Sequence, residues 1–178
     1  MQIFPHQLVN LPVLSLQTGG QIAITTGLLI NPESLTLSAF TCLGLGRAHC
    51  LLLPQDIKQA GAQGLIVDSD EALAEPTDIV RLQPLLEKPF RLEGLPVVTQ
   101  LGRKVGKVET YTISPDDYEI QKLYIHRPIM QSFVGGSLIV DRGQIADVTN
   151  TQIVVKDTEI LATELAAGHL AKTGKLHT

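Results

Sequence analysis

Cys42, His49 and Cys50 are the residues whose types and spacing come closest to a chemical site. Thiolate and imidazole groups bind zinc, but a structural zinc site takes four protein ligands and a catalytic site takes three with a water molecule. The sequence places no fourth ligand near these three residues. A cysteine nucleophile would need His49 or His126 as its base, and no flanking motif accompanies such a pair. We therefore predict small buried cysteines, with no catalytic residue, no metal and no cofactor.

Carboxylates and aromatic side chains offer two further chemistries. Asp116 and Asp117 follow a proline, and such a pair is more typical of a tight turn than of a general acid and base, which converge from separate elements. Nucleic-acid recognition by stacking needs aromatic rings in a basic groove. Tyr111, Tyr118 and Tyr124 lie among basic residues, but their alternating positions favour a place in a core or at the rim of a barrel.

The elements that must position these residues are short strands. Residues 94–155 hold apolar runs rich in Val, Ile and Tyr, separated by Gly, Pro, Asp and Asn, which predicts strands and turns. Gly106 lies inside one such run and predicts a bulge or a bend. Near the end of the chain, Thr158 is a candidate cap for a short helix that extends to Leu170.

The same order of segments occurs twice. Leu11-Pro-Val-Leu matches Leu95-Pro-Val-Val, and Ile30-Asn-Pro-Glu-Ser-Leu matches Ile113-Ser-Pro-Asp-Asp-Tyr, at offsets of 84 and 83 residues. A later pair of segments, 56–67 and 144–155, matches at an offset of 88. We predict an internal duplication, in which residues 8–70 and 91–157 have the same strand order.

The second repeat resembles the PRC-barrel family. This family includes the cytoplasmic domain of the photosynthetic reaction-centre H subunit and the C-terminal domain of the ribosome-maturation factor. The residues that carry the resemblance are Gly94, Gly102, Val105, Gly106, Val108, Pro115 and Asp116. The first repeat fits less well, but it keeps Leu53-Pro-Gln-Asp-Ile at the late corner, where the second has Asp141-Arg-Gly-Gln-Ile. The resemblance implies an all-β chain of two tandem small PRC-like β-barrels, with a short C-terminal helix.

The chain divides into four predicted segments. Residues 1–75 form a first PRC-barrel-like domain, 76–89 an ordered linker, 90–157 a second such domain, and 158–178 a C-terminal helix and tail. The linker contains apolar residues that would be exposed if it were loose, so we expect short helical turns that pack between the domains. These residues are Ile79, Val80, Leu82, Leu85 and Leu86.

Composition limits the partners. The net charge of −4 over 178 residues disfavours a general polyanion binder, although basic residues gather in 88–127 and only Arg47 and Lys58 occur in 8–71. The low charge and a mean hydropathy of +0.17 suggest apolar surface covered by a partner or a second copy. We expect no signal peptide and no transmembrane helix, and hence a cytoplasmic protein, with peripheral membrane association left open.

These observations predict a non-enzymatic protein-interaction adaptor or scaffold that binds a protein partner or itself. The predicted partner-binding residues are Arg127, Ile129, Met130, Phe133 and Val134, in an unusually apolar loop at 126–136. The loop either docks a partner or plugs its own barrel, and we favour docking. The alternatives are an RNA- or ribosome-assembly accessory factor, implied by the ribosome-maturation relative, and a small hydrolase or metal-binding protein.

Overall fold

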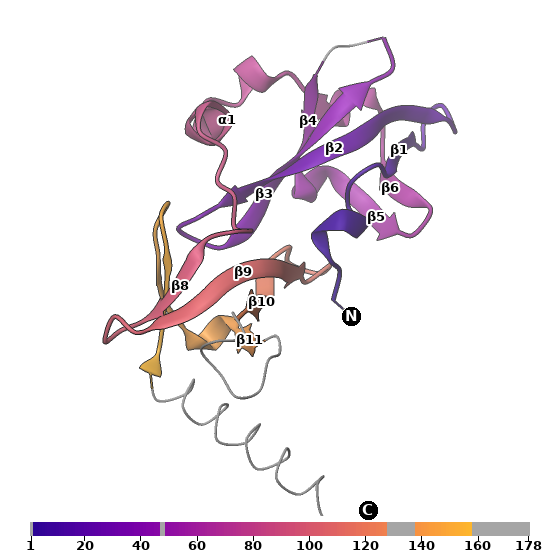
Figure 1. The fold of residues 1–178 in the computed structure, drawn as a ribbon. Helices are drawn as coiled ribbons and strands as arrows, with labels where there is room; N and C mark the ends of the chain where they lie inside the picture. The colour runs from indigo at the N-terminus through magenta and orange to yellow at the C-terminus, as the bar shows by residue number, and fades with distance from the viewer. Residues whose placement is uncertain (1, 47–48, 128–137, 158–178) are drawn as a thin grey trace, which may run out of the picture. The chain divides into compact units, whose positions relative to one another are not determined.

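A computed structural model describes residues 2–46, 49–127 and 138–157, which are mostly β-strand. Two sheets and one short α-helix make up this described part (Figure 1). The predicted predominance of β-structure is therefore confirmed. The chain divides into two compact units: unit 1 is Met1–Arg91 with Thr112–Gln121, and unit 2 is Leu92–Tyr111 with Lys122–Thr178. The domain boundaries predicted from the sequence stay a prediction.

The first sheet has seven strands in the order β5-β6-β1-β2-β3-β4-β7. Its strands are β1 (Pro12–Ser15), β2 (Gln21–Asn31), β3 (Thr36–Gly44), β4 (Cys50–Leu52), β5 (Ile57–Gly61), β6 (Gly64–Val67) and β7 (Leu73–Ala74). β1 pairs with β6 in parallel, and the other neighbours are antiparallel. The turn between β1 and β2 contains Gly19 at a φ of 69°, a conformation that glycine adopts without strain.

The second sheet has six strands in the order β11-β10-β9-β8-β13-β12. Its strands are β8 (Pro96–Thr99), β9 (Lys104–Ile113), β10 (Ile120–His126), β11 (Leu138–Asp141), β12 (Ile145–Val148) and β13 (Ile153–Val155). β8 and β13 are the parallel pair. Gly102, at a φ of 79°, lies in the turn between β8 and β9 and corresponds to Gly19 of the first sheet.

The two sheets share one topology, so the predicted duplication is confirmed at the level of strand order. When β8–β13 are renumbered as β1–β6, the second sheet has the same strand order as the first sheet, except that it lacks the edge strand β7. The registers agree as well. Cys42 lies opposite Cys50 in the first sheet, and the equivalent Ile125 lies opposite Leu138 in the second.

Both repeats bulge at the same place, as the glycine inside the 104–108 run predicted. Val13 lies opposite Ala23 and Val97 opposite Gly106, and the register shifts directly after each pair. A bulge bends its strand and increases the local twist. The two sites differ in crowding, because a Cβ built on Gly106 would meet the carbonyl oxygen of His126.

The late corner has the same shape in both repeats despite the missing proline. In the first, Pro54 begins the 3₁₀ turn Pro54–Asp56, where its ring fixes φ. In the second, the turn is Arg142–Gln144, and the side-chain oxygen of Gln144 accepts a hydrogen bond of 2.7 Å from the backbone N–H of Asp141. A side-chain bond therefore stabilises a turn that proline restricts in the first repeat.

Within unit 1, the turns that follow β2 and β9 pair reciprocally. The N–H of Leu37 donates to the carbonyl of Tyr118, and the N–H of Ile120 donates to the carbonyl of Leu35, each at 2.9 Å. Leu35 and Tyr118 occupy equivalent positions in the two repeats, and both have a left-handed φ, of 49° and 57°. The contact is therefore symmetric in sequence as well as in geometry.

The linker forms the predicted helical turns, and it packs on the first sheet. The 3₁₀ turns Pro76–Asp78 and Val80–Leu82 lead into α1 (Gln83–Glu87), which contacts β2 (Figure 1). Further 3₁₀ turns in the described residues are Pro5–Gln7 and Asp70–Ala72. The buried linker residue Leu82 packs with Leu29, Ala39 and Leu51.

Three predictions are not settled by the described residues. The strand order of each sheet is linear, with no pairing among described residues that joins its two edges, so closure into barrels stays a prediction. The predicted helix at 158–178 and most of the 126–136 loop lie outside the described residues. In the part of the chain that the structure describes, no helix has the length and apolar character needed to cross a membrane.

Candidate functional site

Cys42 and Cys50 are core residues of the first sheet. They lie opposite each other on β3 and β4, at 0% and 2% exposure, whereas His49 is exposed. Burial, with a smaller contribution from the neighbouring Cys50, raises the pKa of the Cys42 thiol to about 12, so the nucleophilic thiolate is scarce at neutral pH. Their equivalents in the second repeat, Ile125 and Leu138, are buried aliphatic residues. The predicted role as small buried hydrophobes is confirmed.

No metal site is found among residues 2–46, 49–127 and 138–157. Within these ranges, no group of three His, Cys, Asp or Glu side chains has the arrangement needed to hold a metal ion. The adjacent carboxylates at 116 and 117 lie in the turn after β9. There Asp117 accepts a hydrogen bond of 3.1 Å from the backbone N–H of Glu119. This local bond is typical of an Asx turn and agrees with the turn that the sequence predicted.

The three tyrosines do not form a stacking platform. Tyr111 is 5% exposed, and burial, followed by the nearby Glu93 carboxylate, raises its pKa. Tyr118 is half-buried and meets the ring of Phe40 edge to face, with centroids 6.1 Å apart, and burial raises its pKa as well. Tyr124 is half-buried on β10. The predicted place in the core is confirmed for Tyr111, whereas Tyr124 lies on the outer face of β10, opposite the exposed Ile139.

Arg127 is the only predicted partner-binding residue that lies in the described part of the chain. Its side chain is half-buried, and its Nε donates a hydrogen bond of 3.3 Å to the carbonyl of Val105, at the bulge of β9. This contact ties the end of β10 to β9. The other four predicted residues, Ile129, Met130, Phe133 and Val134, lie outside the described residues, so the docking patch at 126–136 stays a prediction.

The first sheet carries an apolar surface that the sequence alone did not locate. Side chains alternate between the two faces of a strand, and residues directly opposite each other share a face. Val13 and Cys42 point to the inner face, where both are fully buried. Their neighbours along the strands therefore point outward. We call the exposed end of this outer face the outer strip, and it consists of Pro12, Leu14, Leu16, Ile24, Leu43, Leu45 and Ile66.

The register places the members of the outer strip side by side. Ile24 lies between Pro12 and Leu43, which pair with it from β1 and β3, and Leu14 lies beside Ile66. Leu16 and Leu45 extend the strip at one end, with 62% and 67% of their surface exposed, and Leu43 is 43% exposed. Contiguous exposed aliphatic surface on a folded protein marks interaction sites more often than isolated leucines do.

The outer strip contains no ionisable side chain. At its margin, an ion pair joins Lys58 on β5 to Asp68 after β6, with 2.9 Å between Nζ and the carboxylate oxygen. Both side chains are more than half exposed, so the pair contributes little to stability. A partner would therefore meet aliphatic groups across the strip, with the Lys58–Asp68 ion pair near its margin at β5 and β6 and the exposed His49 beside Leu43.

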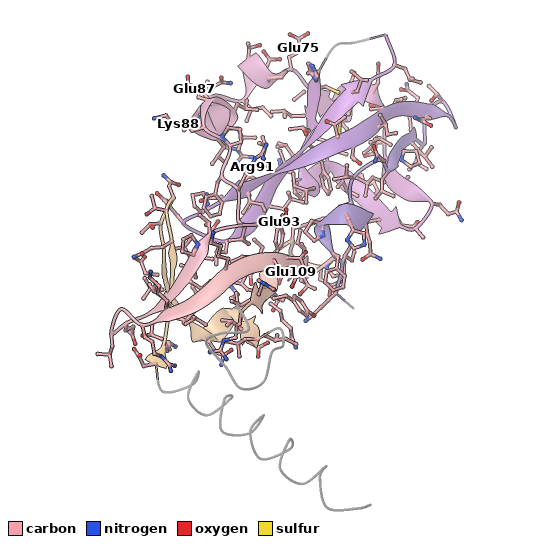
Figure 2. The ribbon with its side chains drawn as sticks, in the orientation of Figure 1. Glu75, Glu87, Lys88, Arg91, Glu93 and Glu109 are labelled. Atoms are coloured by element: carbon pink, nitrogen blue, oxygen red, sulfur yellow. The ribbon has the colours of Figure 1, made fainter. Side chains whose placement is uncertain are left out.

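The other half of the same outer face is already covered. This half contains Leu29, Ala39 and Leu51. Thr41 follows the alternation along β3 and points outward, because its neighbour Cys42 points inward, and Leu51 lies opposite Thr41 on the same face. The linker buries this half with Leu82, which is 4% exposed, and with Ile79, Leu85 and Leu86. Figure 2 places Glu75, Glu87 and Lys88 along the linker, which therefore carries charges that the strip lacks.

Two sequence signals point to the outer strip. Residues 11–16 are apolar at five of six positions rather than alternating, which is typical of a strand with both faces covered. Between residues 8 and 46, Glu33 is the only charged residue. Neither signal assigns side chains to a face, because that assignment depends on the pairing register and on the bulges.

Comparison of the sequence with protein-family models and with curated proteins finds no match.

Proposed function

We propose that this chain is a non-enzymatic scaffold, built from two PRC-barrel-like domains, that docks a protein partner on the outer strip of its first sheet. The observation that carries the proposal is the strip itself: seven adjacent apolar residues without a charge, on the outer face of a sheet. Protein interfaces have apolar centres depleted of charged residues, which is the chemistry that this surface offers.

The experiment is affinity capture with three versions of the chain, followed by measurement with the purified partner. Leu43→Glu places a charge at the middle of the strip. Leu101→Glu is the matched control, since Leu101 is 87% exposed in a turn of the second sheet. We expect the wild type and Leu101→Glu to bind a common partner and Leu43→Glu to lose it. Equal binding by all three would remove the outer strip from the proposal.

The alternative function, an RNA- or ribosome-assembly accessory factor, is favoured by one observation. Arg103, Lys104 and Lys107 are exposed at the start of β9, in the second repeat. Phosphate contacts make affinity fall steeply with salt, whereas apolar docking is nearly independent of it. A strong loss of RNA affinity between low and physiological salt, together with loss on Lys107→Glu, would favour this alternative over the scaffold.

A further inference from the structure

We infer that the occupant of the outer strip is an amphipathic helix of a partner protein, with aliphatic side chains at helical spacing on its contact face. The inference rests on the proposed function and adds the class of partner. It follows from three features of the first sheet: the cover on the adjoining half of the face, the size of the strip, and its lack of charge.

The adjoining half shows what this face accepts. The linker covers it with consecutive helical turns, Val80–Leu82 and Gln83–Glu87, in which Leu85 and Leu86 follow Leu82 by three and four residues. Residues at this spacing share one side of a helix. The covered half and the outer strip belong to the same strands, β2 and β3, and both are lined by aliphatic side chains. A helix of a partner bound to the outer strip would therefore pack on β2 and β3 in the same way as the linker does.

The size of the strip favours a single helix over a second copy of the chain. A standard protein–protein interface uses about 20–30 residues on each side, whereas the strip has seven. A bound helix needs only a few anchors, at i, i+3 or i+4, and i+7, and the strip offers adjacent aliphatic side chains on β6, β1, β2 and β3.

The absence of charge defines the contact face of the helix. A charged side chain brought against the strip would lose its water and meet no ionisable member of the strip. The contact face is therefore aliphatic, and charged residues belong on the opposite side of the helix. Binding should also be nearly independent of ionic strength, because screening acts on charges.

A phage-displayed library of helical peptides with variable surface positions tests the inference directly. The library is selected on the wild-type chain and depleted on Leu43→Glu. We expect the enriched peptides to carry aliphatic residues at i, i+3 or i+4, and i+7. One enriched peptide, measured by fluorescence anisotropy, should bind at least tenfold more weakly to Leu43→Glu, equally to Leu101→Glu, and with less than a twofold change between 50 and 500 mM NaCl.

The possible outcomes distinguish a wrong class of occupant from a wrong docking surface. Peptides without the helical spacing, or peptides that bind Leu43→Glu as well as wild type, would overturn the inference. If the library fails while Leu43→Glu still loses the partner found by capture, the scaffold stands and the helical class is wrong. If sedimentation shows a wild-type dimer that Leu43→Glu and not Leu101→Glu dissociates, the occupant is a second copy and the inference is overturned.

Discussion

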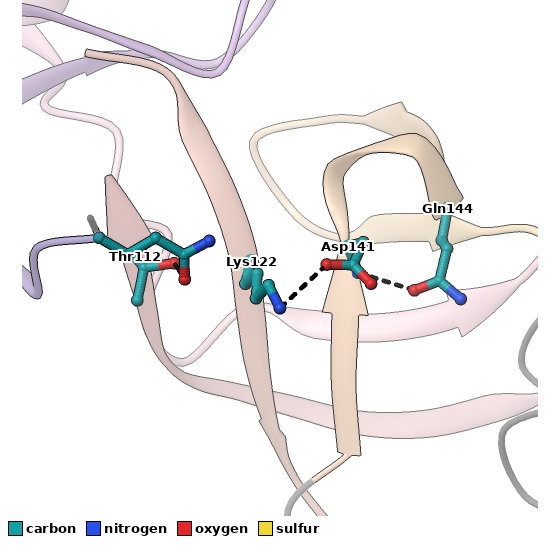
Figure 3. A network of polar contacts seen from close by, with 5 residues as sticks. Thr112, Lys122, Asp141 and Gln144 are labelled. Carbon is teal, nitrogen blue, oxygen red and sulfur yellow. Dashed lines mark hydrogen bonds and ion pairs between the residues drawn. The ribbon is translucent and has the colours of Figure 1, made fainter. Parts of the chain in front are cut away.

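The outer faces of the two repeats have the same strands and different chemistry. Ile24 and Leu43 of the first repeat correspond to Lys107 and His126 of the second, both exposed. Further along the face, Ala39 under the linker corresponds to Lys122. Figure 3 shows Lys122 in an ion pair with Asp141, at 3.5 Å between Nζ and the carboxylate oxygen. At these positions polar or charged side chains of the second repeat replace aliphatic groups of the first, whereas Pro12, Leu14 and Ile66 keep apolar equivalents in Pro96, Val98 and Val154.

The inner faces differ far less, which shows what the fold itself requires. Val13 corresponds to Val97 and Leu65 to Ile153, and all four are fully buried. A topology that tolerates lysine at outer positions in one repeat does not need isoleucine there in the other. Strand pairing therefore does not account for the apolar outer face of the first sheet: the linker covers one half, and we propose a helix of a partner for the other.

The largest expected effect concerns the covered half. Leu82→Ala should lower the free energy of unfolding by about 2–5 kcal/mol, since it removes a buried leucine from a packed cluster and leaves a cavity. Ile139→Ala is the matched control, because Ile139 is the equivalent of Leu51 and is 42% exposed. Urea unfolding measures both. Similar losses for the two variants would mean that the outer faces are not as different as their exposure indicates.

The two bulges provide the second comparison. Gly106→Ala should destabilise by about 1–3 kcal/mol, because its Cβ would press on the backbone carbonyl of His126, whereas the first repeat holds Ala23 at this position. Gly143→Ala is the control, since nothing lies within 4 Å of a Cβ there. Urea midpoints would contradict the expectation if Gly106→Ala lost less than about 0.5 kcal/mol.

The buried thiol of the first repeat should make stability depend on alkaline pH. In the unfolded chain Cys42 loses its proton near the ordinary value of 9.0, and in the folded chain near 12, because burial raises its pKa. The unfolded state therefore binds fewer protons above pH 9, and stability falls by about 1.4 kcal/mol for each pH unit in this window. Cys42→Ala should show a shallower decline in urea unfolding between pH 9 and 11. An unchanged slope would contradict the raised pKa.

Exchange of one outer residue tests whether the apolar face is needed for folding. Ile24→Lys copies Lys107 of the second repeat, so it should change the stability by less than about 1 kcal/mol, as expected of a surface substitution. Binding of the selected helical peptide should weaken at least tenfold, or about 1.4 kcal/mol. Lys107→Ile is the reciprocal control, with binding unchanged. A large loss of stability in Ile24→Lys would show that the fold requires the aliphatic residue.

The smallest effect is expected for the charged face. Lys122→Met removes the ion pair with Asp141, whose side chains are 36% and 61% exposed. Solvent-exposed pairs contribute about 0–1 kcal/mol, so urea unfolding should change by less than about 0.5 kcal/mol. A loss above about 1 kcal/mol that disappears at high salt would show that the outer face of the second repeat depends on its charges.

Local turn chemistry made the strands and the duplication predictable. Prolines and carboxylates after β2 and β9 recur at one offset, and Gly106 marked the bulge because glycine inside a strand has few other uses. The corner at Asp141 fitted less well in sequence, since a hydrogen bond to Gln144 takes the role of a proline. The outer strip was not predictable, because Ile24 and Leu43 become neighbours only once register and bulges are known.

The reciprocal bonds between Leu35, Leu37, Tyr118 and Ile120 have a consequence for assembly. In an isologous homodimer, each contact across the interface occurs twice, with the roles of the two subunits exchanged. The bonds Leu37–Tyr118 and Ile120–Leu35 show the same exchange between equivalent positions of the two repeats. In two separate chains such a contact would form only above a threshold protein concentration. Here one polypeptide carries both halves, so the effective concentration of one turn near the other is set by the connecting chain, and dilution cannot separate them.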